Sequence, residues 1–273
     1  MPAPQSPPRL DVGQALREGW RAFLRAPWHF VAFGLLVTAL QLLLQALQPS
    51  YTPDKLPPLD PESLPTDLGA ALAWLRYGTV TLSLLVLNVI GGTVLNLWGT
   101  SGMVRAAWVA LGGGRPSFAT FTHWDPRALL RLYLPGFLLG CGVVAAISVL
   151  LLLGVIVSQV NGLLLLLPGL LLVAGSLYLS LTQAFLPQVA LLHDDHPFAA
   201  LARGPEVVAP AWPQVVELTL LSLALIVAGL LACGVGLFVA VPVVTCVGTA
   251  AYRQLFGPDD RTGFSRSVPK LPV

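Results

Sequence analysis

The run His193, Asp194, Asp195 and His196 has the side chains in this sequence that most resemble a metal site. Neutral imidazoles and carboxylates are both ligands for divalent ions. Four adjacent residues cannot all turn toward one ion, however, and zinc and calcium motifs space their ligands along the chain. The alternative is that these residues mark where a helix reaches water, with Pro197 beginning the next helix. We favour this second interpretation and keep the metal site as the alternative.

Neutral polar residues form a second pattern, inside stretches that are otherwise apolar. Helical spacing places each set on one helix face, where it could line a pocket for a lipid headgroup or a small solute. The commoner use of such groups is hydrogen bonding between helices. The sets are Ser176, Ser180, Gln183 and Pro187 in one stretch, and Asn88, Gly92 and Asn96 in another.

Catalytic chemistry finds little support in the sequence. No GxSxG, HExxH or P-loop motif occurs, and the glycine-rich run GGGRPSF lacks the lysine of a phosphate-binding loop. The basic residues are dispersed around a net charge of +2, which leaves no continuous patch for a nucleic-acid backbone. We therefore predict a protein that is not an enzyme, carries no cofactor and does not bind nucleic acid.

Composition points to a membrane. Hydrophobic residues make up 55% of the chain and charged residues 10%, against roughly 25% charged in soluble domains. A transmembrane helix needs about 20 apolar residues, so uncharged stretches locate the spans. The sequence predicts an all-α integral membrane protein with six transmembrane helices. Their approximate ranges are 29–48, 78–101, 132–156, 163–190, 213–232 and 236–254, with turns at SQVNG and CGVG.

The distribution of charge predicts the orientation, because lysine and arginine accumulate in cytoplasmic loops. With both termini cytoplasmic, all but two of the 15 basic residues lie on that side, Lys55 and Arg76 being the exceptions. In this topology Arg105 belongs to a cytoplasmic loop between the second and third spans. The predicted parts are a disordered segment 1–10, a membrane domain 11–256 with an acidic, proline-rich outer loop 49–67, and a cytoplasmic tail 257–273.

A helix that lies along the inner membrane surface is expected before the first span, over residues 11–27. Its apolar side would enter the acyl boundary, and its arginines would face anionic headgroups. An ordinary basic flank of the first span is the alternative. The apolar side consists of Val12, Leu16, Trp20 and Phe23, and the membrane-surface residues are Arg17, Arg21 and Arg25.

Small residues at intervals of four predict close contact between helices. Gly136 and Gly140 form one such pair, and Ala228, Ala232 and Gly236 continue the spacing elsewhere. The same pattern could bring two copies of the chain together into an oligomer.

Five stretches carry a family resemblance: DVGQALREGWRAFLRAPWHF, GMVRAAWVALGGGRPSFATFTH, LLLLLPGLLLVAGSLYLSLTQAFLPQVALLHDD, PFAALARG and GVGLFVAVPVVTCVGTAAYRQLFG. Together they resemble the membrane domain fused to some bacterial glycerophosphodiester phosphodiesterases, and its stand-alone multi-spanning relatives. The resemblance implies a multi-pass protein of the bacterial inner (plasma) membrane. It also implies a structural loop at Asp194 and Asp195, and Arg203-Gly204-Pro205 would interrupt a helix that is longer in relatives. No segment is long or polar enough for the phosphodiesterase catalytic domain.

These observations leave three hypotheses. We favour a non-enzymatic membrane component related to lipids or the cell envelope, acting as an accessory or scaffold with membrane lipids, and with another membrane protein as a further partner. The first alternative is a transporter or permease subunit for a neutral or lipidic solute, which would use the stripe around Gln183. The second is a membrane-embedded metal hydrolase centred on His193 to His196.

Overall fold

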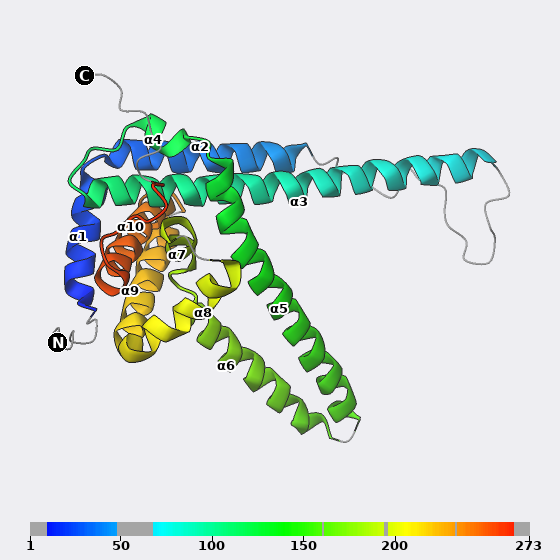
Figure 1. Cartoon of the computed structure of the whole chain (residues 1–273). Coiled ribbons are helices and arrows are strands. Elements are labelled where there is room, and N and C mark those ends of the chain that lie inside the picture. The colour runs from blue at the N-terminus through cyan, green and yellow to red at the C-terminus, as the bar shows by residue number, and fades with distance from the viewer. Residues whose placement is uncertain (1–9, 48–67, 160, 194–195, 233, 265–273) are drawn as a thin grey trace. The chain divides into compact units, whose positions relative to one another are not determined.

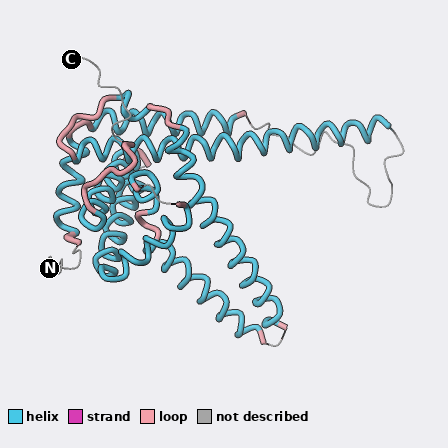
Figure 2. Tube along the Cα trace, in the orientation of Figure 1, coloured by secondary structure: helices cyan, strands magenta, loops and turns pink. Residues whose placement is uncertain are grey.

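The computed structural model describes residues 10–47, 68–159, 161–193, 196–232 and 234–264. Every regular element within these ranges is a helix (Figure 2). The predicted outer loop 49–67, nearly all of the segment 1–10, and residues 265–273 of the tail lie outside the described residues. The all-helical class is confirmed.

Six helical stretches are long and apolar enough to cross a membrane, as predicted. The chain is therefore a multi-pass α-helical membrane protein. The stretches are Pro27–Ala46, Gly78–Leu111, Pro126–Ser158, Leu166–Leu192, Pro197–Leu231 and Leu237–Phe256.

The helices carry the labels of Figure 1. They are α1 (Val12–Leu24), α2 (Pro27–Ala46), α3 (Leu68–Leu111), α4 (Phe118–Thr122), α5 (Pro126–Ser158), α6 (Leu166–Thr182), α7 (Leu186–Leu192), α8 (Pro197–Val208), α9 (Trp212–Leu231) and α10 (Leu237–Phe256). Short 3₁₀ turns, Gly162–Leu165 and Ala209–Ala211, precede α6 and α9. The chain forms two compact units, one of residues 1–34 with 98–273 and one of residues 35–97.

Helix α3 is longer than predicted. Its 44 residues extend about 66 Å at 1.5 Å per residue, roughly twice the hydrocarbon thickness of a bilayer. The helix includes residues 68–76, before the predicted second span, and continues past position 101, where we predicted a loop. The predicted loop position of Arg105 is wrong, because this residue lies within the helix.

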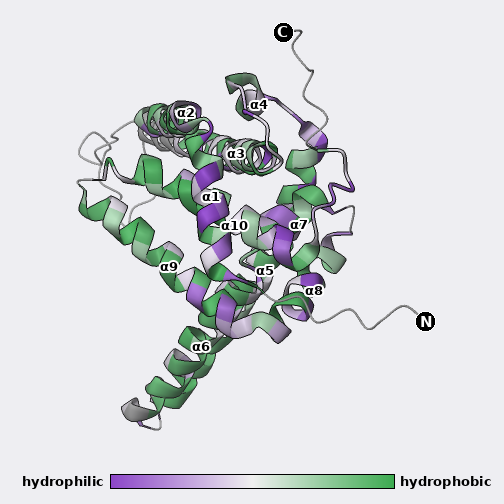
Figure 3. Ribbon diagram, turned by 90° about the vertical axis from the view of Figure 1, so that its left-hand side faces the viewer, coloured by the Kyte–Doolittle hydropathy of each residue, from purple (hydrophilic) through white to green (hydrophobic). Residues whose placement is uncertain are grey.

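Helix α1 lies against α10 (Figure 3). A Cβ atom on Gly19 would lie 2.6 Å from the backbone of Val247, so only glycine permits this approach. Ala15 and Ala22 are buried on the same face, whereas Trp20 is 46% exposed. The helix was predicted, and Val12 and Phe23 of its apolar side are buried together with the small residues Ala15, Gly19 and Ala22.

The hairpin of α9 and α10 turns at the predicted glycines. Gly234 has a φ of +76°, a conformation that other residues rarely adopt. Gly236 approaches Gly229 so closely that an added Cβ would lie 2.7 Å from its carbonyl oxygen. By contrast, a Cβ on Gly136 or Gly140 would meet nothing within 4 Å, so the described residues do not make this predicted close contact.

The fourth predicted span is two helices rather than one, since α6 ends at Thr182 and α7 begins at Leu186. The expected interruption at Arg203-Gly204-Pro205 is wrong, because α8 continues through these residues. A Cβ on Gly204 would lie 2.3 Å from the Thr182 carbonyl oxygen. Glycine here serves the close contact of α8 with α6 and does not end the helix.

Aromatic rings join the first three helices with α4 in the larger unit. The Phe30 ring lies 4.8 Å from that of Phe121 and 5.8 Å from that of Phe23, and Phe33 lies 5.1 Å from Trp98. Such pairs contribute roughly 0.5–1.5 kcal/mol each beyond the area they bury. The cluster fixes the C-terminal part of α3 against the start of α2.

We predict that Gly19→Val separates α1 from α10, because the added side chain would overlap the backbone of Val247. The expected loss is about 1–3 kcal/mol, as for other overpacked sites. Thermal unfolding in detergent would measure it. Gly136→Val is the matched control, because this helix position is open, and equal midpoints for the two variants would contradict the observed packing.

Candidate functional site

A polar concavity of the larger unit lies between α1, the end of α3 and α10. Its volume is about 440 Å³, within the range of roughly 300–1,000 Å³ typical of small-molecule sites. We call it the arginine cleft. Its lining residues are Glu18, Arg21, Ala22, Arg25, Ala110, Leu111, Arg253, Gln254 and Pro258.

The geometry of α1 explains why these side chains meet. Residues three and four apart share a helix face, so positions 18, 21, 22 and 25 form one row along α1. The Asp11 carboxylate begins the helix by accepting the Gln14 backbone N–H at 2.8 Å. The Asp11 N–H in turn donates to Oε1 of Gln254 at 2.9 Å. This bond ties the start of α1 to the end of α10 and aligns the two walls of the cleft.

Two of the cleft arginines are positioned by neighbours. A guanidinium N–H of Arg25 donates to the Ala110 carbonyl oxygen at the end of α3. Cζ of Arg253 lies 5.2 Å from the ring centroid of Trp108, which is a cation–π distance. Both contacts orient the side chains, and neither neutralises their charge.

The cleft also contains one buried donor without an acceptor. Nε2 of Gln254 is buried and has no hydrogen-bond partner in the described part of the chain. Among the described residues, Glu18 forms no ion pair with Arg21, Arg25 or Arg253. A buried donor without an acceptor is costly, whereas the guanidinium groups of Arg21 and Arg25 are exposed and carry a charge that no carboxylate of the described residues neutralises. An anion that presents several oxygens, such as a phosphate, fits these groups.

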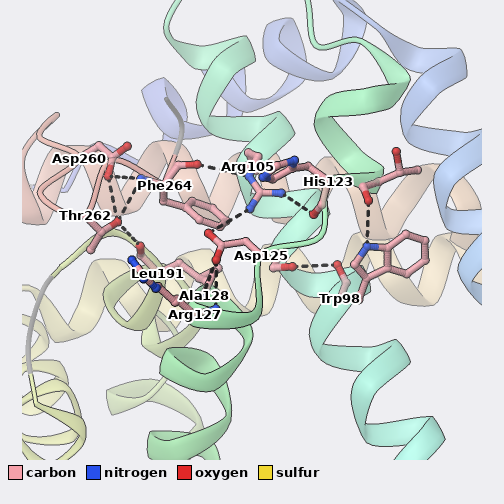
Figure 4. Close-up of polar contacts among 12 residues, drawn as sticks. Trp98, Arg105, His123, Asp125, Arg127, Ala128, Leu191, Asp260, Thr262 and Phe264 are labelled. Atoms are coloured by element: carbon pink, nitrogen blue, oxygen red, sulfur yellow. Dashed lines mark hydrogen bonds and ion pairs between the residues drawn. The ribbon is translucent and has the colours of Figure 1, made fainter. Parts of the chain in front are cut away.

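A second polar cluster surrounds Arg105, whose side chain is fully buried (Figure 4). Its Nη1 donates to the His123 carbonyl oxygen at 3.0 Å and its Nε to that of Phe264 at 3.4 Å. Nη2 lies 4.0 Å from Oδ2 of Asp125, and Cζ lies 4.2 Å from the Phe264 ring centroid. This guanidinium is therefore held by protein groups on several sides, although its Nη2 is buried without a hydrogen-bond partner in the described part of the chain.

The partners of Arg105 come from two other segments. Asp125 caps α5, accepting the N–H groups of Arg127 and Ala128 at 3.1 and 3.2 Å. Phe264 follows α10 and is 1% exposed. A cleft of about 390 Å³, lined by His123 to Arg127, Arg131 and Thr262 to Phe264, lies beside these segments.

The segment that follows α10 is attached to α7 as well. The Thr262 hydroxyl donates to the Leu191 carbonyl oxygen at 2.7 Å, and the Arg261 N–H donates to that of Leu192 at 3.1 Å. These carbonyls belong to the last turn of α7, where helical partners are missing. Residues 257–264, predicted as part of a tail, therefore contact the helical core.

The two histidines of the predicted metal site differ in their exposure to solvent. His193 is 4% exposed, and its Nδ1 lies 2.5 Å from the Tyr252 hydroxyl on α10. His196 is exposed and precedes α8. Asp194 and Asp195 lie outside the described residues, so the metal-site hypothesis stays a prediction. Within the described ranges, no three potential ligands gather.

The predicted polar stripe does not form one face. Ser176 and Ser180 are exposed and donate to carbonyls of their own helix, those of Leu172 and Leu177. Gln183 follows the end of α6 and donates to the Leu201 carbonyl oxygen at 3.1 Å, which joins α6 to α8. The prediction of a shared helix face is wrong, because the helix ends at Thr182. Gln183 makes a hydrogen bond between helices, which is the commoner use given above for such residues.

Asn88 and Asn96 lie in the smaller unit, on α3. Asn88 is half-buried and Asn96 is exposed. Close packing in this unit involves Gly91, where a Cβ would lie 3.0 Å from Leu44 of α2. A pocket at the two asparagines stays a prediction.

The predicted membrane-surface arginines separate into two groups. All three side chains are exposed, but Arg21 and Arg25 line the cleft and Arg17 does not. Sequence reasoning missed Arg253, Gln254 and Glu18, because only the fold brings α10 to α1. The available signal was the one-turn spacing of Glu18 and Arg21, but it could not identify the opposite wall.

No family model matches the chain, and no curated protein or solved structure matches it. The fold alone defines the class of the protein, an α-helical multi-pass membrane protein with six candidate spans.

We predict that Arg105→Met lowers the free energy of unfolding by roughly 2–4 kcal/mol, because it removes the donor to the His123 and Phe264 carbonyl oxygens and the ion pair with Asp125. Arg105→Lys should recover only part of this, since an ammonium lacks the planar fork. Thermal unfolding in detergent is the measurement, with the exposed Arg115→Met as the control. A midpoint for Arg105→Met equal to that of the control would contradict the role given to Arg105.

Proposed function

We propose that the protein is a non-enzymatic, multi-pass component of a bacterial inner membrane that binds phospholipid headgroups at its cytoplasmic face and serves lipid or envelope homeostasis. The observation that carries the proposal is the arginine cleft. Three guanidinium groups and one unpartnered amide converge there. Planar guanidinium groups match phosphate oxygens in geometry and charge, and binding at such a site needs no catalytic group.

Its surroundings support a lipid rather than a soluble ligand. Trp20, Leu24 and Trp28, on α1 and at the start of α2, are 46%, 53% and 83% exposed. Aromatic residues of this kind concentrate at membrane interfaces. The positive-inside pattern predicts that α1 lies on the cytoplasmic side, where anionic leaflet lipids attract basic residues.

We predict that Arg21→Gln and Arg253→Gln each reduce phospholipid binding about tenfold to a hundredfold, because each removes a charge-assisted hydrogen bond worth about 1.5–3 kcal/mol. The measurement is native mass spectrometry after mild detergent extraction, with added phospholipid. Arg17→Gln is the matched control, since it removes the same charge from α1 outside the cleft.

Two results would count against the proposal. One is a wild-type protein that retains no phospholipid at any lipid concentration tested. The other is an Arg17→Gln variant that loses as much lipid as Arg21→Gln, which would indicate general surface charge rather than the cleft.

A further inference from the structure

The arginine cleft has a carboxylate in its wall as well as its cations. Glu18 lies on the same face of α1 as Arg21 and Arg25 and lines the same cavity. An ordinary arrangement would pair this carboxylate with an arginine one turn away. In the described residues no such pair forms, so charges of both signs face the cavity separately.

The neighbours of Glu18 hold it in place. Its Oε1 accepts a hydrogen bond from Nε2 of Gln14 at 2.8 Å, one turn earlier in α1. That bond orients the carboxylate without neutralising it, because an amide carries no charge. The carboxylate is an acceptor only, whereas every polar group of Arg21, Arg25 and Arg253 is a donor.

A ligand that complements both parts must carry an anion and a cation of its own. Guanidinium groups and the Gln254 amide would take phosphate oxygens, and a primary ammonium supplies the donors that a carboxylate accepts. A headgroup with phosphate alone would leave Glu18 unpaired and repelled at short range.

We infer that the arginine cleft selects a phosphodiester that bears a primary amine, of the phosphoethanolamine type, with the phosphate at Arg21 and Arg253 and the ammonium at Glu18. The inference rests on the proposed function, because the phosphate half is shared with it. It adds Glu18 as the residue that determines specificity.

The test compares phosphatidylethanolamine with phosphatidylglycerol of identical acyl chains, titrated into the full-length protein in detergent and followed by native mass spectrometry. Wild-type protein should prefer phosphatidylethanolamine at least fivefold. Glu18→Gln keeps an amide oxygen for Gln14 and should remove that preference while both lipids still bind. Glu206→Gln, an exposed carboxylate on α8, is the matched control and should behave as wild type.

The outcomes separate the two levels of the argument. Binding of neither lipid would overturn the proposed function. Equal binding of both lipids by wild type, or an unchanged preference in Glu18→Gln, would overturn only the inference about the amine. Soluble glycerophosphoethanolamine distinguishes the source: displacement of bound lipid by it would identify the headgroup chemistry alone as the ligand, whereas binding of phosphatidylethanolamine only would identify a lipid.

Discussion

The buried guanidinium of Arg105 is the constraint on which the packing around the end of α3 depends. A cation with no exposed surface is tolerated only where acceptors replace its water. Here the acceptors come from the α4–α5 connection and from the segment after α10, so α3 can continue as a helix through a charged position. The same segment supplies donors to the last carbonyls of α7. Loss of one side chain would therefore free two connections and a helix end together.

The membrane spans could be predicted from sequence because they depend on length and apolar composition, which are local properties. The glycine turn at Gly234 was equally local. The end of the second span could not be predicted in this way. Counting uncharged stretches assumes that a charge ends a span, and Arg105 violates the assumption through contacts with residues 18 and 159 positions away. Long-range satisfaction of a charge leaves no periodic signal in the sequence.

The candidate site, too, could be predicted from the sequence only where its residues lie on one helix. Arg21 and Arg25 were recognised because spacing by one turn is visible in one helix, but the other wall of the cleft comes from α10. That wall is set by Gly19, which lets α1 approach the backbone of Val247, and by the Asp11 bond to Gln254. A glycine in an amphipathic pattern carries no sign of its partner, so neither Arg253 nor Gln254 could be assigned beforehand.

Comparison of the two arginine clusters explains why only one is proposed to bind a ligand. Around Arg105 the protein provides carbonyls, a carboxylate and an aromatic ring, so an added anion would have to compete with Asp125 for the guanidinium. In the arginine cleft the charges are oriented by Trp108 and Ala110 but not neutralised, although a carboxylate lies on the same helix. Charges that are oriented but not paired remain available to a ligand. Because the protein has already restricted these side chains, binding costs less conformational entropy. Affinity at such a site depends on how well the ligand matches the arrangement of both charges, and this requirement links the proposed lipid binding to the selectivity inferred for Glu18.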